Sequence, residues 1–254
     1  ISKSQITKLP IQTTAEILSN QPGVHLQKSQ AGGGSPNIRG LEANRILLMI
    51  DGVRMNNAIY RGGHLQNAIT IDPRIIASSE ILFGPSSVVY GSDALGGVIH
   101  FKTKTPSLNK PLATNYTGNY FSANQATLHH FDAEYASGQF AFLSSLSQSF
   151  FGTATMGKNR MHGYADWGEI YHTMENGQQK TNVNPHKNPK AAYSQSDLLQ
   201  KIVFKPWDSK RLIGNVQYSE SSNINRLDQL NDYQGGVLKF EDWYYGPQKR
   251  FLTA

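Results

Sequence analysis

Apolar residues are arranged in two different ways along the chain, and the change falls at Thr105-Pro106. Before this point the apolar runs are short and continuous, and Ile46–Ile50 is the clearest of them. A continuous run of this length is typical of a strand buried on both faces. After this point apolar and polar residues alternate, which is the pattern of strands with one apolar and one polar face. We therefore expect a small α+β unit in residues 1–105 and a different, strand-rich unit in residues 106–254.

The first unit is predicted to combine short helices with short strands. Thr13-Thr14 can cap a helix that ends before Pro22-Gly23, since a hydroxyl accepts hydrogen bonds from the free N–H groups of the first turn. Asp72-Pro73 opens a helical turn through Ile76, with proline at the position where its missing N–H costs nothing. Strands are predicted at Val24–Leu26, Ile46–Ile50, Glu80–Phe83 and Val98–Lys104.

Glycines mark several turns in this unit. The stretch Ala31–Pro36 contains three consecutive glycines. It lacks both the lysine and hydroxyl residue of a P-loop and the spacing G-x-G-x-x-G, so we predict a flexible loop and no phosphate site. Asp51-Gly52 predicts a tight turn after the buried run. Gly96-Gly97 predicts a bend or a close approach of two backbones.

The second unit shows five alternating runs and the start of a sixth. Each run has about the nine to eleven residues with which a tilted strand crosses a bilayer. Two long polar stretches, residues 152–194 and 221–248, are predicted to be loops without regular structure. The alternating runs are residues 113–124, 128–136, 139–151, 197–205 and 212–219, and the sixth begins at residue 250.

Composition favours a wall between lipid and water over a cytosolic enzyme. Charged residues make up only 17% of the chain and aromatic residues 10%, a balance that suits strands with one face toward lipid. No stretch approaches the roughly 20 apolar residues of a membrane helix, so a membrane location would require strands. Cysteine is absent, which excludes disulfides and thiolate sites. The net charge of +6 comes without a run of like charges, which argues against a nucleic-acid partner.

The stretch Ile71–Lys104 carries a resemblance to a known family. Its Gly84-Pro85, Tyr90-Gly91 and Gly96-Gly97, followed by a strand that ends in Lys-Thr-Lys, resemble the plug domain of TonB-dependent outer-membrane receptors. Upstream, Arg39-Gly40 resembles the Ile/Phe-Arg-Gly found at the head of a plug strand, and residues 45–54 match the strand and Asp-Gly-Val turn of the family. Phe83 departs from the basic residue that many members carry before Gly-Pro, so no salt bridge is carried over there.

The resemblance implies a fold for both units. Residues 1–105 would be an α+β plug domain with a small mixed sheet. Residues 106–254 would be the N-terminal strands of a large antiparallel transmembrane β-barrel. Because plugged transporters use about 22 strands, we expect this chain to be a fragment.

The resemblance also implies a function and a location. The protein would be a TonB-dependent transporter in the outer membrane of a Gram-negative bacterium, and not an enzyme. It would import a scarce iron-containing ligand, with haem slightly favoured over a ferric siderophore or another metal chelate, and it would need no prosthetic group. Its partners would be outer-membrane lipid, the TonB energy-transducing complex, and the extracellular ligand or its carrier protein.

The TonB docking segment is not recognisable in Ile1–Pro10. The chain begins with Ile1 and shows no leader pattern, so we expect any signal peptide to be absent from it.

Candidate ligand-binding residues lie in loops. In the family, the segment that contains Tyr60, Arg61 and His64 belongs to the apical loops of the plug, and His64 is a candidate ligand of haem iron. Three further histidines in the long polar stretch could meet the ligand, although their spacing matches no metal motif. They are His162, His172 and His186. Histidines in such loops are more often simply solvated.

Three other classes of protein are alternatives to this interpretation. A plugless porin or an adhesin would explain the strands but not the first hundred residues. A soluble β-rich protein that binds or hydrolyses glycans would explain the aromatic residues, but Asp132 and Glu134 share one strand face, for which exposure to a barrel lumen is the simpler account. A nucleic-acid binder would rest on net charge alone.

Overall fold

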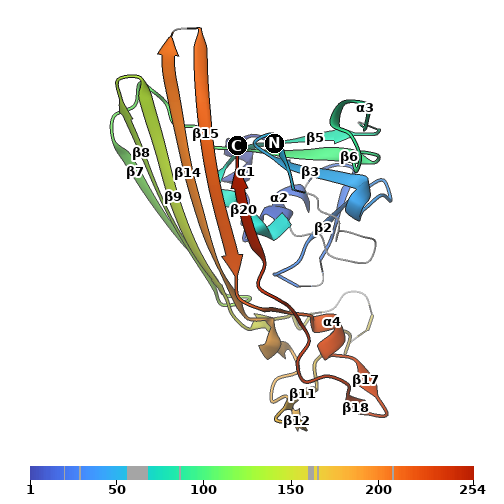
Figure 1. Cartoon of the computed structure of the whole chain (residues 1–254). Coiled ribbons are helices and arrows are strands. Elements are labelled where there is room, and N and C mark those ends of the chain that lie inside the picture. The colour runs from blue at the N-terminus through green and yellow to red at the C-terminus, as the bar shows by residue number, and fades with distance from the viewer. Residues whose placement is uncertain are drawn as a thin grey trace.

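The computed structural model consists of two β-sheets and a group of short hairpins at one end (Figure 1). A small four-stranded sheet packs beside a taller six-stranded sheet. We call the elements from α1 to β6 the inner unit and the six-stranded sheet the wall. The structure describes all residues except 20, 29, 56–67, 86, 160–162, 165 and 208.

The inner unit is built on a mixed sheet with the strand order β4-β3-β6-β5. Strand β3 pairs in parallel with β6, whereas β4 and β5 pair antiparallel with their neighbours. All five residues of β3 are buried, as the continuous apolar run predicted. The strands are β3 (Ile46–Ile50), β4 (Val53–Arg54), β5 (Ile76–Phe83) and β6 (Gly97–Thr103).

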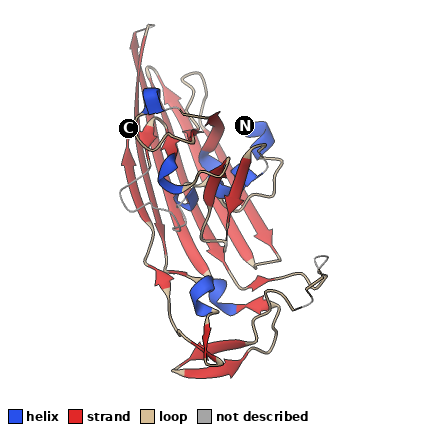
Figure 2. Ribbon diagram, turned by 90° about the vertical axis from the view of Figure 1, so that its right-hand side faces the viewer, coloured by secondary structure: helices blue, strands red, loops and turns tan. Residues whose placement is uncertain are grey.

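Short helices and one hairpin surround this sheet (Figure 2). The two predicted helices are present, and the second is a 3-10 turn in which the Asp72 carboxylate accepts a hydrogen bond from the N–H of Arg74. None of the described helices is long and apolar enough to cross a membrane. The helices are α1 (Lys3–Ile6), α2 (Thr14–Ser19), η1 (Ala43–Arg45), η2 (Ala68–Thr70), η3 (Pro73–Ile75) and α3 (Ser87–Tyr90), and the hairpin consists of β1 (Val24–Gln27) and β2 (Ser35–Ile38).

One local prediction for this hairpin is wrong. Arg39-Gly40 follows β2 in a tight turn with φ of 51° and 82°, so it lies at the end of a strand and not at its head. The glycine run before β2 lies outside helices and strands, as the predicted loop requires, and it is buried. A Cβ added at Gly34 would lie 2.5 Å from the Cβ of Ala15, which explains why the chain needs glycine where it passes α2 just before β2.

The wall is antiparallel throughout, with the order β20-β15-β14-β9-β8-β7. The five predicted runs and the sixth onset all form strands, each within a few residues of the expected bounds. The strands are β7 (Ala113–Phe121), β8 (Ala126–Ser137), β9 (Phe140–Phe151), β14 (Tyr193–Trp207), β15 (Lys210–Ser221) and β20 (Lys249–Thr253).

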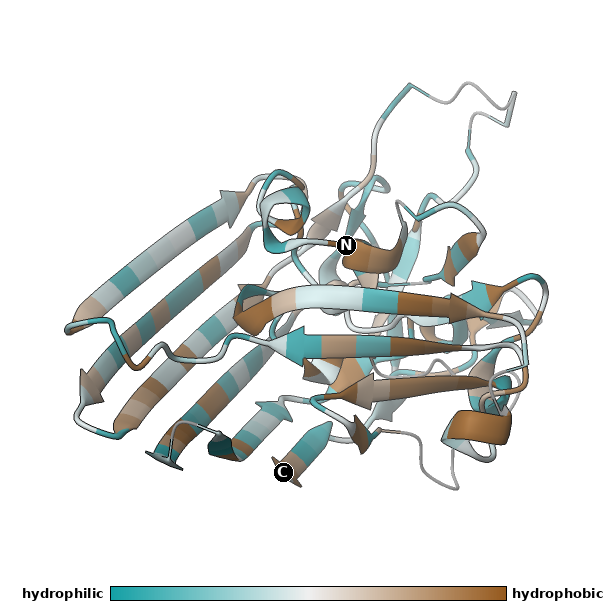
Figure 3. Ribbon diagram, turned by 90° about the horizontal axis from the view of Figure 1, so that it is seen from above, coloured by the Kyte–Doolittle hydropathy of each residue, from teal (hydrophilic) through white to brown (hydrophobic). Residues whose placement is uncertain are grey.

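Polar and apolar residues alternate along the strands of the wall, as the colour bands in Figure 3 show. On β8, Phe131 and Tyr135 are 46% and 49% exposed, whereas His130 and Asp132 between and beside them are buried. The same alternation continues on β9, where Leu146 is exposed and Ser147 is buried. The face toward the inner unit is therefore largely polar, and the apolar side chains point away from it.

The long polar stretches fold together at one end of the wall, and we call residues 152–192 and 222–248 the outer lobe (Figure 1). The prediction of loops without regular structure is wrong here, since β11 and β12 form a hairpin. The Glu241 carboxylate joins the two parts by accepting hydrogen bonds from the N–H groups of Asn176 and Gly177. The elements are β10 (Ala154–Thr155), β11 (His172–Glu175), β12 (Gln178–Thr181), β13 (Lys187–Asn188), η4 (Pro189–Ala191), β16 (Ile224–Asn225), α4 (Leu227–Leu230), β17 (Tyr233–Gln234), β18 (Val237–Leu238) and β19 (Tyr244–Tyr245).

Candidate functional site

Asp51 connects the inner unit to the wall through several hydrogen bonds. It lies in the β3–β4 turn, with φ of 47°, where Gly52 follows it. Its carboxylate accepts from Lys201 Nζ at 3.1 Å, from Asn215 Nδ2 at 2.6 Å and from Gln217 Nε2 at 3.2 Å. Within the inner unit it also accepts from the N–H of Thr103 at 2.8 Å. A buried ion pair needs such additional partners to offset its lost hydration.

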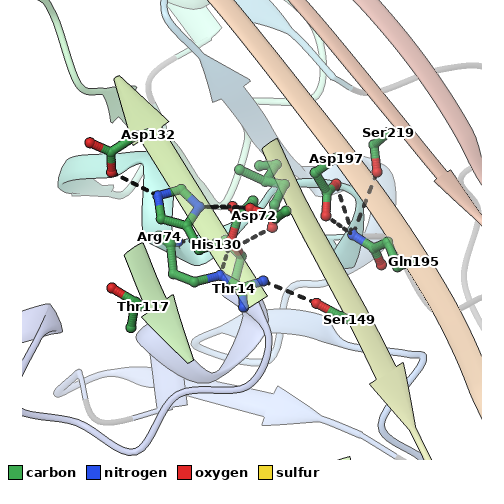
Figure 4. Close-up of polar contacts among 12 residues, drawn as sticks. Thr14, Asp72, Arg74, Thr117, His130, Asp132, Ser149, Gln195, Asp197 and Ser219 are labelled. Carbon is green, nitrogen blue, oxygen red and sulfur yellow. Dashed lines mark hydrogen bonds and ion pairs between the residues drawn. The ribbon is translucent and has the colours of Figure 1, made fainter. Parts of the chain in front are cut away.

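A second polar cluster surrounds Asp72 at the start of η3 (Figure 4). Arg74 Nε donates to the carboxylate at 2.6 Å, and His130 Nδ1 lies 3.2 Å from it. Ser147 of the wall also donates to Asp72. Arg74 reaches the wall as well, because its Nη2 donates to Ser149 Oγ at 3.0 Å. Asp72 thus contacts two wall strands, β8 through His130 and β9 through Ser147.

The charge of Asp72 follows from these neighbours. Burial alone would raise the pKa of the Asp72 carboxyl. The charge of Arg74 and the contacts with His130 and Ser147 outweigh burial and hold that pKa well below its usual range. Asp72 is therefore an anion that these partners stabilise inside the molecule.

The polar contacts extend along the wall in both directions. His130 Nε2 lies 2.9 Å from the Asp132 carboxylate, which also accepts from Lys104 Nζ at 2.6 Å. On β14, Gln195 Nε2 donates to the Ile69 carbonyl of the inner unit at 2.8 Å and contacts the Asp197 carboxylate at 3.0 Å. The inner unit is thus fastened to the wall by charged and amide groups along much of their interface.

Two sizeable cavities adjoin this interface. One, of about 570 Å³, lies between the N-terminal segment, η3 and strands β7 and β8, and it is lined by charged side chains such as Lys104 and Glu134. The other, of about 440 Å³, lies between Gln30-Ala31 of the inner unit and the outer lobe, and apolar side chains predominate in its lining. Both lie in the size range of small-molecule pockets.

The predicted ligand residues are only partly placed. Tyr60, Arg61, His64 and His162 lie outside the described residues. In the outer lobe, His172 Nδ1 lies 3.1 Å from the Tyr233 hydroxyl, and His186 Nδ1 lies 3.4 Å from a Glu169 carboxylate oxygen. These two histidines therefore have different partners. Among the described residues, no three His, Asp or Glu side chains are grouped so as to hold a metal ion.

Sequence reasoning missed the polar cluster residues. Asp51 was predicted only as a turn residue, and Asp72 only as a helix cap. Lys201 lies within an alternating strand, where a charged residue on the polar side indicates only that this side is not facing lipid. The positive charge of Lys201 on the polar side of its strand was the signal that the sequence offered. The sequence does not show which acidic residue pairs with Lys201.

The first part of the chain is similar to known proteins. Residues 1–98 match the family "TonB-dependent Receptor Plug Domain". The chain is similar to the "Vitamin B12 transporter BtuB" of Vibrio vulnificus (strain YJ016), at 38% identity over 106 residues, covering 41% of this chain and 17% of that protein. It is also similar to "Heme/hemopexin utilization protein C" of Haemophilus influenzae, at 36% identity over 104 residues, covering 40% of this chain and 14% of that protein.

Solved structures resemble the wall as well as the inner unit. The hemophore receptor HasR of Serratia marcescens, in complex with its hemophore HasA and heme, gives a TM-score of 0.69 at 19% identity, over 87% of this chain and 31% of HasR. The FrpB iron transporter of Neisseria meningitidis (F5-1 variant, apoprotein form) gives a TM-score of 0.69 at 15% identity, over 89% of this chain and 32% of FrpB. The chain thus spans about a third of these structures. Residues 1–98 therefore carry a TonB-dependent receptor plug domain, and this domain packs against a six-stranded antiparallel wall in a fold similar to that of these receptor structures.

Proposed function

We propose that the whole protein is a TonB-dependent transporter that imports a scarce ligand across the outer membrane of a Gram-negative bacterium. The observation that carries this proposal is the two-faced wall. Its polar face holds the plug through Asp51 and Asp72, and its other face exposes apolar side chains such as Phe131 and Leu146. A wall with lipid on one side and a hydrated interior on the other has this distribution.

The proposed mechanism assigns a role to each part of the chain. We place the boundary between plug and barrel at Thr105-Pro106. The TonB complex would pull on a segment that precedes the plug, and the plug would then rearrange to open a path. Ile1 is attached to the plug sheet, because the N–H of Ser79 donates to the Ile1 carbonyl at 3.0 Å. Tension applied before Ile1 would therefore act directly on the edge of β5.

Haem is the ligand that we favour, with a ferric siderophore as the alternative. The likeness to a heme/hemopexin utilization protein and to HasR supports haem. The likeness to the ferric enterobactin receptor PfeA supports the alternative. In this proposal Tyr60, Arg61 and His64 contact the ligand from the plug, with His64 on the haem iron. Three histidines of the first long polar stretch contact the ligand or its carrier protein, namely His162, His172 and His186.

Uptake by living cells tests the transport proposal. The whole protein would be expressed in a Gram-negative strain that lacks its own haem receptor, with and without a functional TonB complex. We expect growth on haem as the sole iron source only when the complex is present. Growth that is equal without the complex would contradict energised transport and would favour a porin.

A spectral titration tests the ligand assignment separately. Haem added to the purified protein should shift the Soret band, and His64→Ala should reduce this shift. His129→Ala provides the control, because His129 lies on the exposed face of β8 beside Phe131 and its Nδ1 lies 2.7 Å from the Tyr116 hydroxyl. An unchanged Soret band would contradict haem binding, and a shift that His64→Ala leaves intact would contradict ligation by His64.

A further inference from the structure

The turn between β14 and β15 lies at the end of the wall opposite the outer lobe, where these two strands extend beyond their neighbours (Figure 1). Trp207 ends β14 and Lys210 begins β15, and the two residues are partners across the hairpin. Trp207 is 64% exposed. Lys210 Nζ lies 5.7 Å from the centre of the Trp207 ring, which is within the range of a cation–π contact. An indole and an ammonium group therefore lie side by side at this end of the wall.

Both side chains lie on the apolar face of the wall. Side chains at alternate positions of a strand share a face, so Lys210 shares its face of β15 with Leu212, Val216 and Tyr218, all of which are exposed. This is the face that we propose to contact lipid, and Lys210 ends it at the turn. Opposite residues of an antiparallel pair also share a face, which places Trp207 beside Lys210 there.

Aromatic side chains mark the depth of this position. Phe140 stacks on Phe204 with the ring centres 4.5 Å apart, and Phe204 lies opposite both Phe140 and Leu212 in the sheet. Outer-membrane barrels carry such aromatic residues at the level of the lipid headgroups. Trp207 and Lys210 follow this stack toward the turn. The ammonium group would therefore lie among the headgroup phosphates, outside the hydrocarbon.

The protein leaves the positive charge of Lys210 without a carboxylate. Lys210 forms no ion pair with any acid among the described residues. Residues 205–211 contain three basic side chains and one acid in the sequence. At the other end of β15, by contrast, the charges are balanced within the protein, because Lys249 pairs with Glu220 at 2.7 Å. An anion from outside the protein can therefore pair with Lys210.

We infer that Lys210 and Trp207 form a binding site for a phospholipid whose headgroup carries a net negative charge. The headgroup phosphate would pair with Lys210, while the indole of Trp207 packs against the glycerol and the first part of an acyl chain. A zwitterionic lipid carries its own cation beside the phosphate and gains less from Lys210. The inference rests on the proposed function, because it takes the apolar face of the wall to lie in lipid. A lipid bound here would help to fix the depth of β14, the strand whose Lys201 pairs with the plug.

Quenching of Trp207 fluorescence by brominated lipid tests this inference. The whole protein would be reconstituted in phosphatidylcholine bilayers with a small added fraction of phosphatidylglycerol or phosphatidylcholine that carries bromine on its acyl chains near the headgroup. The Trp207 signal is the difference between the native protein and Trp207→Phe, so Trp167, Trp243 and any tryptophan elsewhere cancel. Brominated phosphatidylglycerol should quench Trp207 as strongly as an about fivefold larger fraction of brominated phosphatidylcholine.

Arg211→Gln is the matched control for Lys210→Gln. Each substitution removes one positive charge from the turn, but Arg211 is the next residue on β15 and points to the opposite face of the wall. Each variant would be measured against its own Trp207→Phe counterpart and against unbrominated lipid. Lys210→Gln should abolish the preference for phosphatidylglycerol. Lys210→Arg should keep it, and Arg211→Gln should leave it nearly unchanged.

The possible outcomes separate this inference from the proposed function. Equal quenching of the native protein by the two brominated lipids would overturn the inference while leaving the wall in the bilayer. Equal losses of preference with Lys210→Gln and Arg211→Gln would also overturn it, because the turn would then attract anionic lipid only through its total charge. Absence of quenching by either lipid would place Trp207 outside the bilayer and would overturn the inference together with the proposed function.

Discussion

Asp51 and Lys201 are 150 positions apart in the sequence, yet their side chains meet at 3.1 Å between the plug and the wall. The Lys201 side chain is only 3% exposed and that of Asp51 14%. Two charges removed from water are stable only when both are well paired. This ion pair therefore fixes the position of the β3–β4 turn on β14, and any displacement of the plug must break it.

Replacing Lys201 with methionine should destabilise the folded protein by about 3–5 kcal/mol, because Asp51 stays buried without its counter-ion. The free energy of unfolding can be measured by denaturant titration in detergent. Hydrogen exchange at the Thr103 amide provides a local measure, because this N–H donates to Asp51. The amide should exchange faster in the variant.

Lys249→Met is the matched control for this substitution. Lys249 pairs with Glu220 at 2.7 Å, but their side chains are 59% and 39% exposed. A surface pair of this kind contributes less than about 1 kcal/mol. Equal effects of the two substitutions would contradict the special role of the buried pair.

Gly34→Ala should destabilise the plug by about 1–3 kcal/mol through overpacking. The added methyl group would lie 2.5 Å from the Cβ of Ala15, so β2 and α2 would have to separate. Gly214→Ala is the control, because a Cβ there meets nothing within 4 Å. Thermal unfolding of both variants provides the comparison. An unchanged midpoint for Gly34→Ala would show that the hairpin and helix shift freely.

The strands of the wall were predictable because alternation is a local property. The run predicted at residues 139–151 is β9 at Phe140–Phe151 in the structure. Successive side chains on a strand point to opposite faces, so a strand with one polar and one apolar face is visible in the sequence as alternation. Alternation also separates Phe131 from Asp132, but it does not indicate which of them faces inward. The prediction that Asp132 faces inward required the resemblance to a plugged barrel.

The polar contacts between plug and wall were not predictable, because they depend on packing between distant segments. Asp72 has the sequence signature of a helix cap and does cap η3. Its contact with Ser147 comes from β9, 75 positions later. The outer lobe was missed for a related reason. Its hairpins are short and polar, and contacts such as that of Gln179 with the N–H of Leu238 hold them together in place of an apolar core.

Acidification should weaken the plug through His100. Its Nε2 accepts a hydrogen bond from the N–H of Gly52 at 3.0 Å, which requires the neutral imidazole. Burial and the neighbouring Lys102 lower the pKa of His100 from its usual 6.5, against the smaller opposing effects of Glu80 and Asp51. Because the folded pKa is lowered, the unfolded chain takes up the proton first as the pH falls. The stabilisation is therefore complete above about pH 6.5 and is lost below it.

Comparison of the native protein with His100→Asn checks this pH dependence. Unfolding midpoints would be recorded from about pH 8 to about pH 5, the range in which histidine changes its charge. The native protein should lose more stability across this range than the variant, which cannot titrate at this position. If the unfolding midpoints of the two proteins fall equally with pH, groups other than His100 cause the acid sensitivity.

Glu241→Ala should loosen the outer lobe without unfolding the wall. The Glu241 carboxylate accepts from the N–H groups of Asn176 and Gly177 at 2.6 and 2.7 Å, and so connects the two parts of the lobe across 65 and 64 positions. Hydrogen bonds to a charged group contribute about 1.5–3 kcal/mol each. Limited proteolysis should therefore cut the variant faster within residues 222–248. Glu175→Ala removes a carboxylate from the same lobe, but Glu175 pairs with Lys180 at a surface where each side chain is 51% exposed. Its cleavage rate should match that of the native protein, and equal acceleration by both substitutions would mean that Glu241 does not hold the two parts together.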